Sequence, residues 1–248
     1  MAINEGDFIK INFTGKIKST DEIYDTTIEE LAQEAGVYNN NKVYAPSMFI
    51  VGAHQTFNEI EDAVIGCEVG DKKTVEVPCE NAFGERNPKL IKTMHVKEFK
   101  KQGLNPYPGL IFQSEGSTGK VLTVNGGRVK VDFNNELSGK DLLCEVEICD
   151  IVEDTNERIK GLIQLRYAMP NVNIDNTKIN IVDDVVNITL DPISRYDQQS
   201  YMQITLLRFE IARDIYENID GINQVNFVDE FSKPEDKSES SEEAESEE

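Results

Sequence analysis

Metal-binding side chains are scarce in this 248-residue sequence. It contains two histidines, His54 and His95, and four cysteines, Cys67, Cys79, Cys144 and Cys149. The cysteines have neither the C-x-x-C spacing nor the histidine partners that a zinc site requires. We therefore predict no metal site, and we interpret the cysteines as reduced thiols in the core of a cytosolic protein.

Long apolar runs are also lacking. No run approaches the roughly 18 residues that a transmembrane helix needs. The start of the sequence, "MAINEGDFIK", has none of the apolar stretch that a signal peptide contains. We therefore expect a cytoplasmic protein without a membrane partner.

Positive charge is in short supply. The chain has 25 lysines and arginines against 46 aspartates and glutamates, which gives a formal net charge of −21. A third of this excess lies in residues 235–248, which hold eight acids and one lysine. Without a basic stripe to displace counterions from a phosphate backbone, we expect no nucleic-acid partner. Two interpretations of the acidity stay open, namely solubility through self-repulsion and an acidic face for basic clients.

Apolar and polar residues alternate in several short segments, which predicts the strands of an α+β fold. "FIKINFTGKI" places Ile9, Ile11 and Phe13 on one face of a half-buried strand. Further strands are expected at residues 23–24, 49–52 and 72–78. Each is bounded by turn residues, as short strands of a compact sheet usually are.

Two short helices are expected between these strands. "TTIEELAQEAG" has an apolar stripe, with Thr26 or Thr27 as the predicted N-cap and Gly36 as the C-cap. "TFNEIEDAVIGCEVGD" has apolar residues at helical spacing, with Asn58 as the predicted N-cap and Gly66 and Gly70 as the stop signals.

An insertion interrupts the first domain. From Arg86 prolines and glycines break the pattern, and "GKVLTVNGGRVKVDF" then predicts a hairpin that turns at Asn125-Gly126-Gly127. "DLLCEVEICDIV" alternates in the manner of the first 80 residues. We interpret it as a strand of the first domain that residues 86–133 separate from its partners.

A new unit is expected after Glu153. Its predicted elements are a helix stopped at Pro170, a hairpin around residues 183–184, a helix over residues 198–217 and a final strand at "QVNFV". The long helix has an apolar stripe of Ile204, Leu207, Ile211 and Ile215, which must pack on something and so permits self-association. Residues 232–248 are mainly Ser and Glu and are predicted to be a disordered acidic tail.

Five stretches together resemble the FKBP-type peptidyl-prolyl isomerases. In family order they are "INFTGKI", "EIYDTT", "FIVGAHQTFNEIEDAVIGCEVGDKKTVEVP", "NAFGERNP" and "VDFNNELSGKDL". They are most similar to the SlyD-like and long archaeal members, in which an insert-in-flap domain interrupts the barrel. The resemblance implies an antiparallel sheet wrapped on a short helix, a small β-rich insert and a separate C-terminal α+β domain.

This resemblance also implies the domain boundaries. The isomerase domain would comprise residues 1–85 plus 134–153, and the insert-in-flap domain residues 86–133. The C-terminal domain would span residues 154–231, followed by the tail.

The implied activity is rotation about X–Pro bonds, which is slow because amide resonance must be lost. An apolar pocket that strips water from the planar, more dipolar amide favours the twisted transition state. No nucleophile, metal or cofactor is needed. The implied partners are unfolded or partly folded polypeptides that contain proline.

By resemblance, nine positions form the pocket. The catalytic positions are Asp25, Phe57, Phe83 and Phe13, and the substrate-binding positions are Tyr24, Phe49, Thr56, Ile60 and Cys144. The resemblance implies that the backbone N–H of Phe57 donates a hydrogen bond to the substrate carbonyl. Two alternatives stay open, since Asp25 can be a turn aspartate and the apolar positions can be ordinary core.

The pocket departs from the family pattern. Phe13 and Phe83 replace usual tyrosines, Cys144 replaces a common Phe, and Thr56-Phe57-Asn58-Glu59 replaces Val-Ile-x-Gly. A neutral hydrogen bond contributes about 0.5–1.5 kcal/mol, so each lost hydroxyl should cost no more than roughly tenfold in rate. We expect attenuated activity, and the alternative is a holdase or binding module with a weakened or inactive pocket.

In relatives the insert is a chaperone surface for unfolded chains. The corresponding candidates are Leu104, Tyr107, Leu110 and Ile111, and the alternative is that they form the insert's own small core. The nickel-binding tail of SlyD is absent, because residues 232–248 contain neither His nor Cys.

Overall fold

The computed structural model describes residues 1–114, 116–167, 172–196 and 199–231. It divides into two compact units, Met1–Glu153 and a second unit from Asp154 onward.

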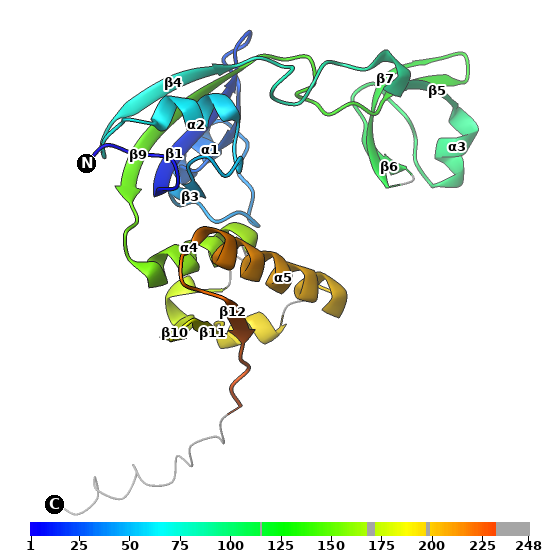
Figure 1. The fold of residues 1–248 in the computed structure, drawn as a ribbon. Coiled ribbons are helices and arrows are strands. Elements are labelled where there is room, and N and C mark those ends of the chain that lie inside the picture. The colour runs from blue at the N-terminus through cyan, green and yellow to red at the C-terminus, as the bar shows by residue number, and fades with distance from the viewer. Residues whose placement is uncertain (115, 168–171, 197–198, 232–248) are drawn as a thin grey trace, which may run out of the picture. The chain divides into compact units, whose positions relative to one another are not determined.

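A five-stranded antiparallel sheet forms the base of the first unit (Figure 1). Its strands are β1 (Phe8–Ile17), β2 (Ile23–Thr26), β3 (Ser47–Ile50), β4 (Lys72–Val77) and β9 (Leu142–Ile151). The order is β2-β1-β9-β4, and β3 pairs with β1. Helix α2 (Asn58–Val64) packs against β4 and β9, and the short helix α1 (Glu29–Glu34) follows β2. The strands predicted from alternation are therefore confirmed, and so is the α+β class.

Strand β9 confirms the predicted insertion. It pairs with β1 over Ile151 to Leu142 and with β4 over Glu147 to Leu142, so it lies in the middle of the sheet. Its inward residues, from Leu142 through Cys144 and Val146 to Ile148, are all buried. The strand that completes the core thus comes from beyond the insert.

The predicted N-caps are wrong, whereas Gly36 and Gly66 lie just beyond the two helix ends with positive φ values of +70° and +80°, as the predicted stops require. Helix α2 has Phe57 at its N-cap, with no side-chain cap bond, and Asn58 is its first residue. Helix α1 has Ile28 at its N-cap, because the two threonines before it bond to β1 instead. The Thr26 hydroxyl donates to the Phe13 carbonyl at 3.0 Å, and the Thr27 hydroxyl accepts the Phe13 N–H at 2.9 Å.

The insert has its own core under a four-stranded antiparallel sheet of order β5-β8-β7-β6. After a 3-10 turn at Pro88–Leu90, its elements are β5 (Ile91–His95), α3 (Val96–Lys101), β6 (Ile111–Ser114), β7 (Ser117–Asn125) and β8 (Arg128–Asp132). The buried core comprises Phe99, Phe112, Val121, Val129 and Val131. The predicted hairpin is confirmed, and Gly126 and Gly127 adopt the positive φ values of +53° and +78° that its turn requires.

A short neck joins the insert to the five-stranded sheet. We define it as Arg86, Asn87, Asp132 and Asn134. Arg86 forms an ion pair with the buried carboxylate of Asp132. The Asn87 N–H donates to Asn134 Oδ1 at 2.8 Å, and Asn134 Nδ2 donates back to the Asn87 carbonyl at 3.1 Å. The two connecting segments are therefore bonded to each other where they cross between the two sheets.

The second unit is a small α+β domain. It contains α4 (Thr155–Arg166), β10 (Lys178–Val182), β11 (Val185–Thr189), α5 (Tyr201–Asn218) and β12 (Gln224–Phe227), with 3-10 turns at Ile174–Asn176 and Pro192–Tyr196. The predicted hairpin and final strand are confirmed as β10, β11 and β12, and β11 and β12 pair in parallel.

The α5 stripe is only partly buried. Ile211 and Ile215 lie in the core, whereas Ile204 and Leu207 are half-buried. Helix α4 ends at Arg166, and its predicted stop at Pro170 lies outside the described residues. The predicted tail, residues 232–248, lies outside them too.

The four cysteines differ in burial. All four are free; Cys67 and Cys144 are buried, while Cys79 and Cys149 are half-buried. The core prediction is therefore wrong for Cys79 and Cys149. Among the described residues, no group of three or more His, Cys, Asp and Glu side chains is arranged to hold a metal ion. No helix in the described ranges is long and apolar enough to cross a membrane.

Candidate functional site

Three aromatic rings meet at one edge of the five-stranded sheet. Tyr24 comes from β2, Phe57 from the entry to α2, and Phe83 from the loop after β4. The ring centroids of Tyr24 and Phe83 are 6.4 Å apart, those of Phe57 and Phe83 are 6.1 Å apart, and both pairs are edge-to-face. This arrangement is favourable for aromatic rings. Phe83 is 37% exposed, so the cluster reaches the surface.

The residues predicted beside these rings are apolar and buried. Phe49, Ile60 and Cys144 belong to the core cluster of the five-stranded sheet, on which Phe13, Tyr24 and Phe57 pack. Six of the nine predicted pocket positions therefore lie in one connected cluster, and ring contacts add Phe83. Phe49, Ile60 and Cys144 have less than 5% of their surface exposed, so they can form only the base of a pocket.

The thiol of Cys144 lies under the Tyr24 hydroxyl, with Sγ and Oη 3.9 Å apart. Burial raises the pKa of Cys144 to about 11 and also raises the pKa of Tyr24. Both groups are therefore neutral at physiological pH, which keeps this part of the cluster uncharged.

Gly15 makes room for the Tyr24 ring. On β1 it is opposite Asp25 on one side and Cys144 on the other. A Cβ at this position would lie 2.4 Å from Cζ and from Oη of Tyr24. The ring therefore lies across bare backbone, which is how its hydroxyl comes within reach of Cys144.

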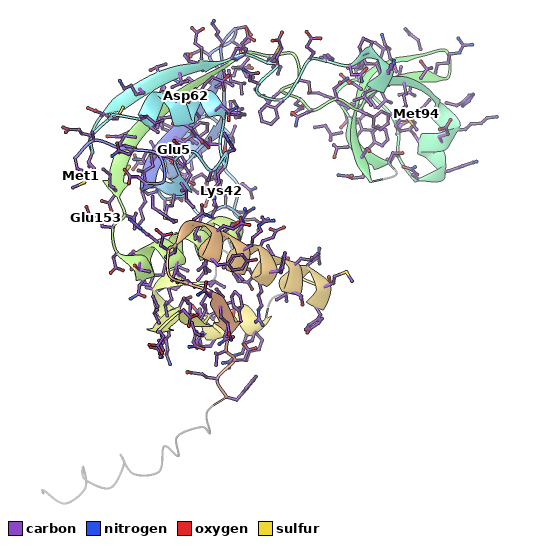
Figure 2. The ribbon with its side chains drawn as sticks, in the orientation of Figure 1. Met1, Glu5, Lys42, Asp62, Met94 and Glu153 are labelled. Atoms are coloured by element: carbon purple, nitrogen blue, oxygen red, sulfur yellow. The ribbon has the colours of Figure 1, made fainter. Side chains whose placement is uncertain are left out.

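The carboxylate of Asp25 is half-buried and already has two partners. It forms an ion pair with Lys42, labelled in Figure 2, and accepts the Thr26 N–H at 2.9 Å. Lys42 also lies 5.6 Å from the ring centroid of Tyr44. The single acid among the predicted positions is thus neutralised by a cation from the loop before β3.

Glu61 organises the loop that leads to Phe57. Its carboxylate is buried on α2 and accepts three backbone N–H groups: Gly52 at 2.9 Å, His54 at 3.3 Å and Thr56 at 3.4 Å. The buried carboxylate of Glu61 therefore holds the loop of residues 52–56 in place. Because Thr56 immediately precedes Phe57, this acceptor also orients the predicted peptide-binding N–H of Phe57.

Gly15, Lys42 and Glu61 are the residues that sequence reasoning missed. A signal existed for Glu61, which lies between Ile60 and Val64 on the apolar face of its helix, where a carboxylate needs partners. Gly15 and Lys42 gave no comparable signal, since their partners are distant in the sequence.

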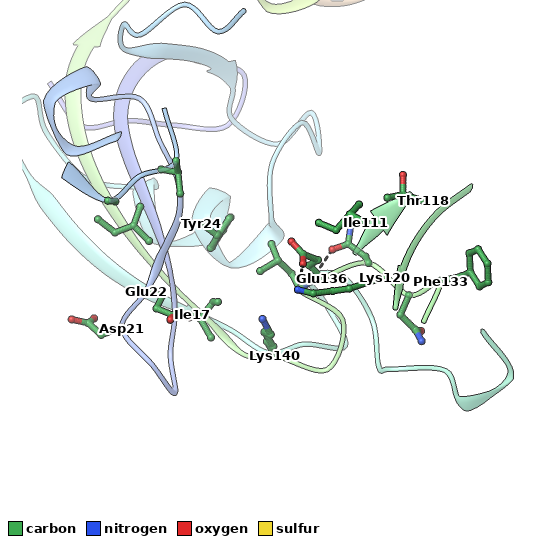
Figure 3. Close-up of a pocket in the computed structure, with 16 residues that line it drawn as sticks. Ile17, Asp21, Glu22, Tyr24, Ile111, Thr118, Lys120, Phe133, Glu136 and Lys140 are labelled. Carbon is green, nitrogen blue, oxygen red and sulfur yellow. Dashed lines mark hydrogen bonds and ion pairs between the residues drawn. The ribbon is translucent and has the colours of Figure 1, made fainter. Parts of the chain in front are cut away.

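A cavity of about 1090 Å³ adjoins the ring cluster at Tyr24 (Figure 3). Its lining comes from the β1–β2 hairpin, the residues after α1, strands β6 and β7, and residues 133–140. Lys120 and Glu136 form an ion pair of 2.6 Å in its wall. Of the predicted functional residues, Tyr24 and Ile111 line this cavity.

The four predicted chaperone residues of the insert fall into two groups. Leu104 and Leu110 pack against the insert's core, as the alternative interpretation held. Tyr107 and Ile111 are 59% and 55% exposed. Only the second pair is available for contact with a partner.

Comparison with known proteins decides the family. A family model described as FKBP-type peptidyl-prolyl cis-trans isomerase matches residues 1–102. The chain is also 34% identical over 149 residues to the short-type peptidyl-prolyl cis-trans isomerase of Methanocaldococcus jannaschii, a match that covers 60% of this chain and 94% of the relative. The chain belongs to the FKBP-type peptidyl-prolyl cis-trans isomerases.

Two further family models match later parts of this isomerase. One described as FKBP26, IF domain, matches residues 92–137, and one described as FKBP26_C-terminal matches residues 155–232. They confirm the insert and the separate C-terminal domain that the resemblance implied.

Bacterial relatives are similar to part of the chain. The probable FKBP-type 16 kDa isomerase of Pseudomonas fluorescens is 34% identical over 110 residues, which is 43% of this chain and 73% of the relative. The isomerase SlyD of Escherichia coli (strain K12) is 29% identical over 136 residues, covering 52% and 68%.

Proposed function

We propose that this isomerase accelerates rotation about X–Pro bonds in folding polypeptides, with Tyr24, Phe57 and Phe83 enclosing the proline. The observation that carries the proposal is the apolar character of the cluster. Its rings contact one another over a base of Phe49, Ile60 and Cys144, and the neighbouring Tyr24 hydroxyl and Cys144 thiol are uncharged.

Such a surface favours a twisted amide. The planar X–Pro amide is more dipolar than its transition state, so losing water costs the planar form more. The Phe57 N–H would hold the substrate carbonyl, and Glu61 would keep the preceding loop in place for it. A binding surface that is already ordered does not have to be ordered again by each substrate.

A refolding assay limited by proline isomerisation tests this proposal. We expect the protein to accelerate refolding, and Asp25→Ala to lower the acceleration. Glu76→Ala is the control, because it also removes the acid of an ion pair with a lysine, here Lys18. A refolding rate that neither the protein nor Asp25→Ala alters would refute the proposal.

We also propose that the insert holds unfolded chains, through Tyr107 and Ile111. Both side chains are exposed, and large exposed apolar groups are typical of binding surfaces. The double variant Tyr107→Ser/Ile111→Ser should suppress the aggregation of an unfolded client less well than the native protein. Ile65→Ser/Val69→Ser, which removes two exposed apolar residues outside the insert, should suppress it normally. Equal suppression by all three proteins would contradict this role.

A holdase with an inactive pocket is the second candidate. The ion pair of Asp25 with Lys42 favours it, because a neutralised acid contributes less field to a bound amide. Aggregation suppression that survives Asp25→Ala, together with unaccelerated refolding, would establish the holdase.

We further propose that copies of the chain associate through α5. Met202, Leu206 and Phe209 are spaced on one face of this helix and are largely exposed. Leu206→Asp/Phe209→Asp should lower the mass observed by sedimentation. An unchanged mass would count against association through this face.

The cytoplasm is the compartment we propose, because four unpaired cysteines suit a reducing environment.

A further inference from the structure

The insert has a charge opposite to that of the rest of the chain. Residues 86–133 hold nine lysines and arginines and three acids, whereas the other residues hold sixteen and 43. The expectation that no basic stripe exists is therefore wrong for this segment, because a net charge averages over domains. A module of charge +6 is inserted into a chain of net charge −21.

Part of this charge gathers on one side of the insert's sheet. Val129 and Val131 of β8 point into the core, so Arg128 and Lys130 point outward. Their neighbours on β5 are His95 and Thr93, and those on β7 are Asn125 and Thr123. We call these six residues the basic face.

The two cations of the basic face have no acidic partner among the described residues. None of the cross-strand neighbours of Arg128 and Lys130 is an acid, and neither cation forms an ion pair with any residue that the structure describes. The Glu98 carboxylate accepts the backbone N–H of His95 at 3.1 Å but pairs with neither cation. Lys120, by contrast, is paired with Glu136, and Arg86 with Asp132. Two cations about 7 Å apart on one strand are thus left without an ion-pair partner in the described part of the chain.

The two lysines at the end of helix α3 do not indicate a second binding face. Lys100 and Lys101 form its last turn, where cations stabilise the helix dipole. Their position therefore has a structural explanation, which Arg128 and Lys130 lack.

We propose that the basic face binds acidic segments of unfolded polypeptides. The proposal rests on the insert's proposed role as a polypeptide-holding surface and names the class of client. Alternate side chains of an extended chain have the spacing of Arg128 and Lys130, and the Thr93, Thr123 and Asn125 side chains can donate to carboxylates. Exposed charge pairs are individually weak, so the main effect is selection and steering of acidic clients, which salt screens.

A nucleic acid fits the basic face less well. Single strands bind by stacking their bases on aromatic side chains, and no Phe, Tyr or Trp is among these six residues. A long polyanion would also be repelled by the acidic remainder of the chain, whereas a short acidic segment can stay within a Debye length of the face.

Fluorescence anisotropy with the full-length protein tests the proposal. The probes are two labelled, proline-free, unfolded peptides of equal length with the same apolar residues. One carries Glu and the other Ser at the remaining positions. We expect tighter binding of the acidic peptide at low salt, and loss of that preference as ionic strength rises.

Matched charge variants locate the site. Arg128→Glu/Lys130→Glu should weaken binding of the acidic peptide roughly 2- to 30-fold, the factor expected when two exposed charge pairs are lost. Lys100→Glu/Lys101→Glu makes the same change of charge on α3 and should retain the preference. Arg128→Gln/Lys130→Gln, without the repulsion, should show a smaller loss, and circular dichroism shows whether each variant is folded.

Four outcomes would overturn the proposal. Equal weakening by both Glu double variants would mean that only net charge matters. A single-stranded oligonucleotide that displaces the acidic peptide and binds more tightly would assign the face to nucleic acid. If both peptides bind the native protein equally and Tyr107→Ser/Ile111→Ser weakens the binding of both, the insert holds unfolded chains but does not select acidic ones. If neither peptide binds, the holding role falls as well.

Discussion

Gly15 determines the position of the Tyr24 ring. We expect Gly15→Ala to displace this ring, since the new methyl group would overlap it. Overpacking typically costs about 1–3 kcal/mol, and the edge-to-face contact with Phe83 contributes about 0.5–1.5 kcal/mol. Both the unfolding free energy and kcat/KM on a short proline peptide should fall.

Gly119→Ala is the matched control for this prediction. Its Cβ would lie 2.8 Å from Phe133 and from Val131, in the core of the insert. It should cost comparable stability and leave kcat/KM on a short peptide unchanged. A kcat/KM equally low in both variants would refute the role of Gly15 in the site.

Glu61 is the residue on which the loop before Phe57 depends. In Glu61→Gln the amide oxygen can still accept from Gly52, while the NH₂ group cannot accept the Thr56 N–H. A hydrogen bond to a charged group contributes about 1.5–3 kcal/mol, so we expect kcat/KM to fall about tenfold or more. Hydrogen exchange at the Thr56 amide should accelerate in parallel.

Asp62→Asn is the control, because it changes an exposed carboxylate one residue further along the same helix (Figure 2). Native exchange at Thr56 in Glu61→Gln would show that the carboxylate does not hold the loop.

At the scale of elements, the neck holds the insert through a buried carboxylate. Burial alone would raise the pKa of Asp132. Hydrogen bonds from Asn134 and the Arg86 guanidinium outweigh this effect and hold the pKa of Asp132 below its ordinary value. A lowered folded-state pKa means that the stabilisation is complete above the unfolded value of about 3.9 and disappears as the pH falls through the folded-state pKa.

We therefore expect Asp132→Asn to lower the unfolding free energy by about 1–3 kcal/mol at pH 7. The difference from the native protein should shrink as the pH falls below about 3.9, as urea unfolding can measure. Asp150→Asn, at an exposed position on β9, should have little effect at either pH. A deficit that is the same at both pH values would mean that the charge of Asp132 is not its cause.

Strands were predictable from the sequence because alternation is local. "FIKINFTGKI" and "DLLCEVEICDIV" revealed β1 and β9, and the change of pattern between them revealed the insertion. The N-cap of α1 was not predictable, since Thr26 and Thr27 bond to a strand thirteen or fourteen residues earlier. The candidate site likewise has features that were predictable from the sequence and features that were not. Motif order indicated the aromatic positions, while the ion pair of Asp25 with Lys42 depends on the path of a loop.

At the scale of the whole molecule, the first unit contains both of its cores. The cluster around Ile60 and the insert's cluster around Val129 lie entirely within residues 1–153. We expect a chain that ends at Glu153 to unfold cooperatively in urea, as monitored by far-UV circular dichroism. It should also retain the kcat/KM of the full chain on a short peptide. An unfolded product would show that the C-terminal unit is required for folding.

The central position of β9 affects how this protein is made. β4 ends at Val77 and β9 begins at Leu142, so about 65 residues separate a strand from its neighbour. At roughly 5–20 residues per second, a ribosome needs about 3–13 s to synthesise that interval. During this time β1 and β4 present unpaired edges, while the insert, whose contacts are local, can already fold and form the neck. The nascent chain thus completes its insert before its isomerase domain, and for several seconds the isomerase is itself an unfinished β-sheet.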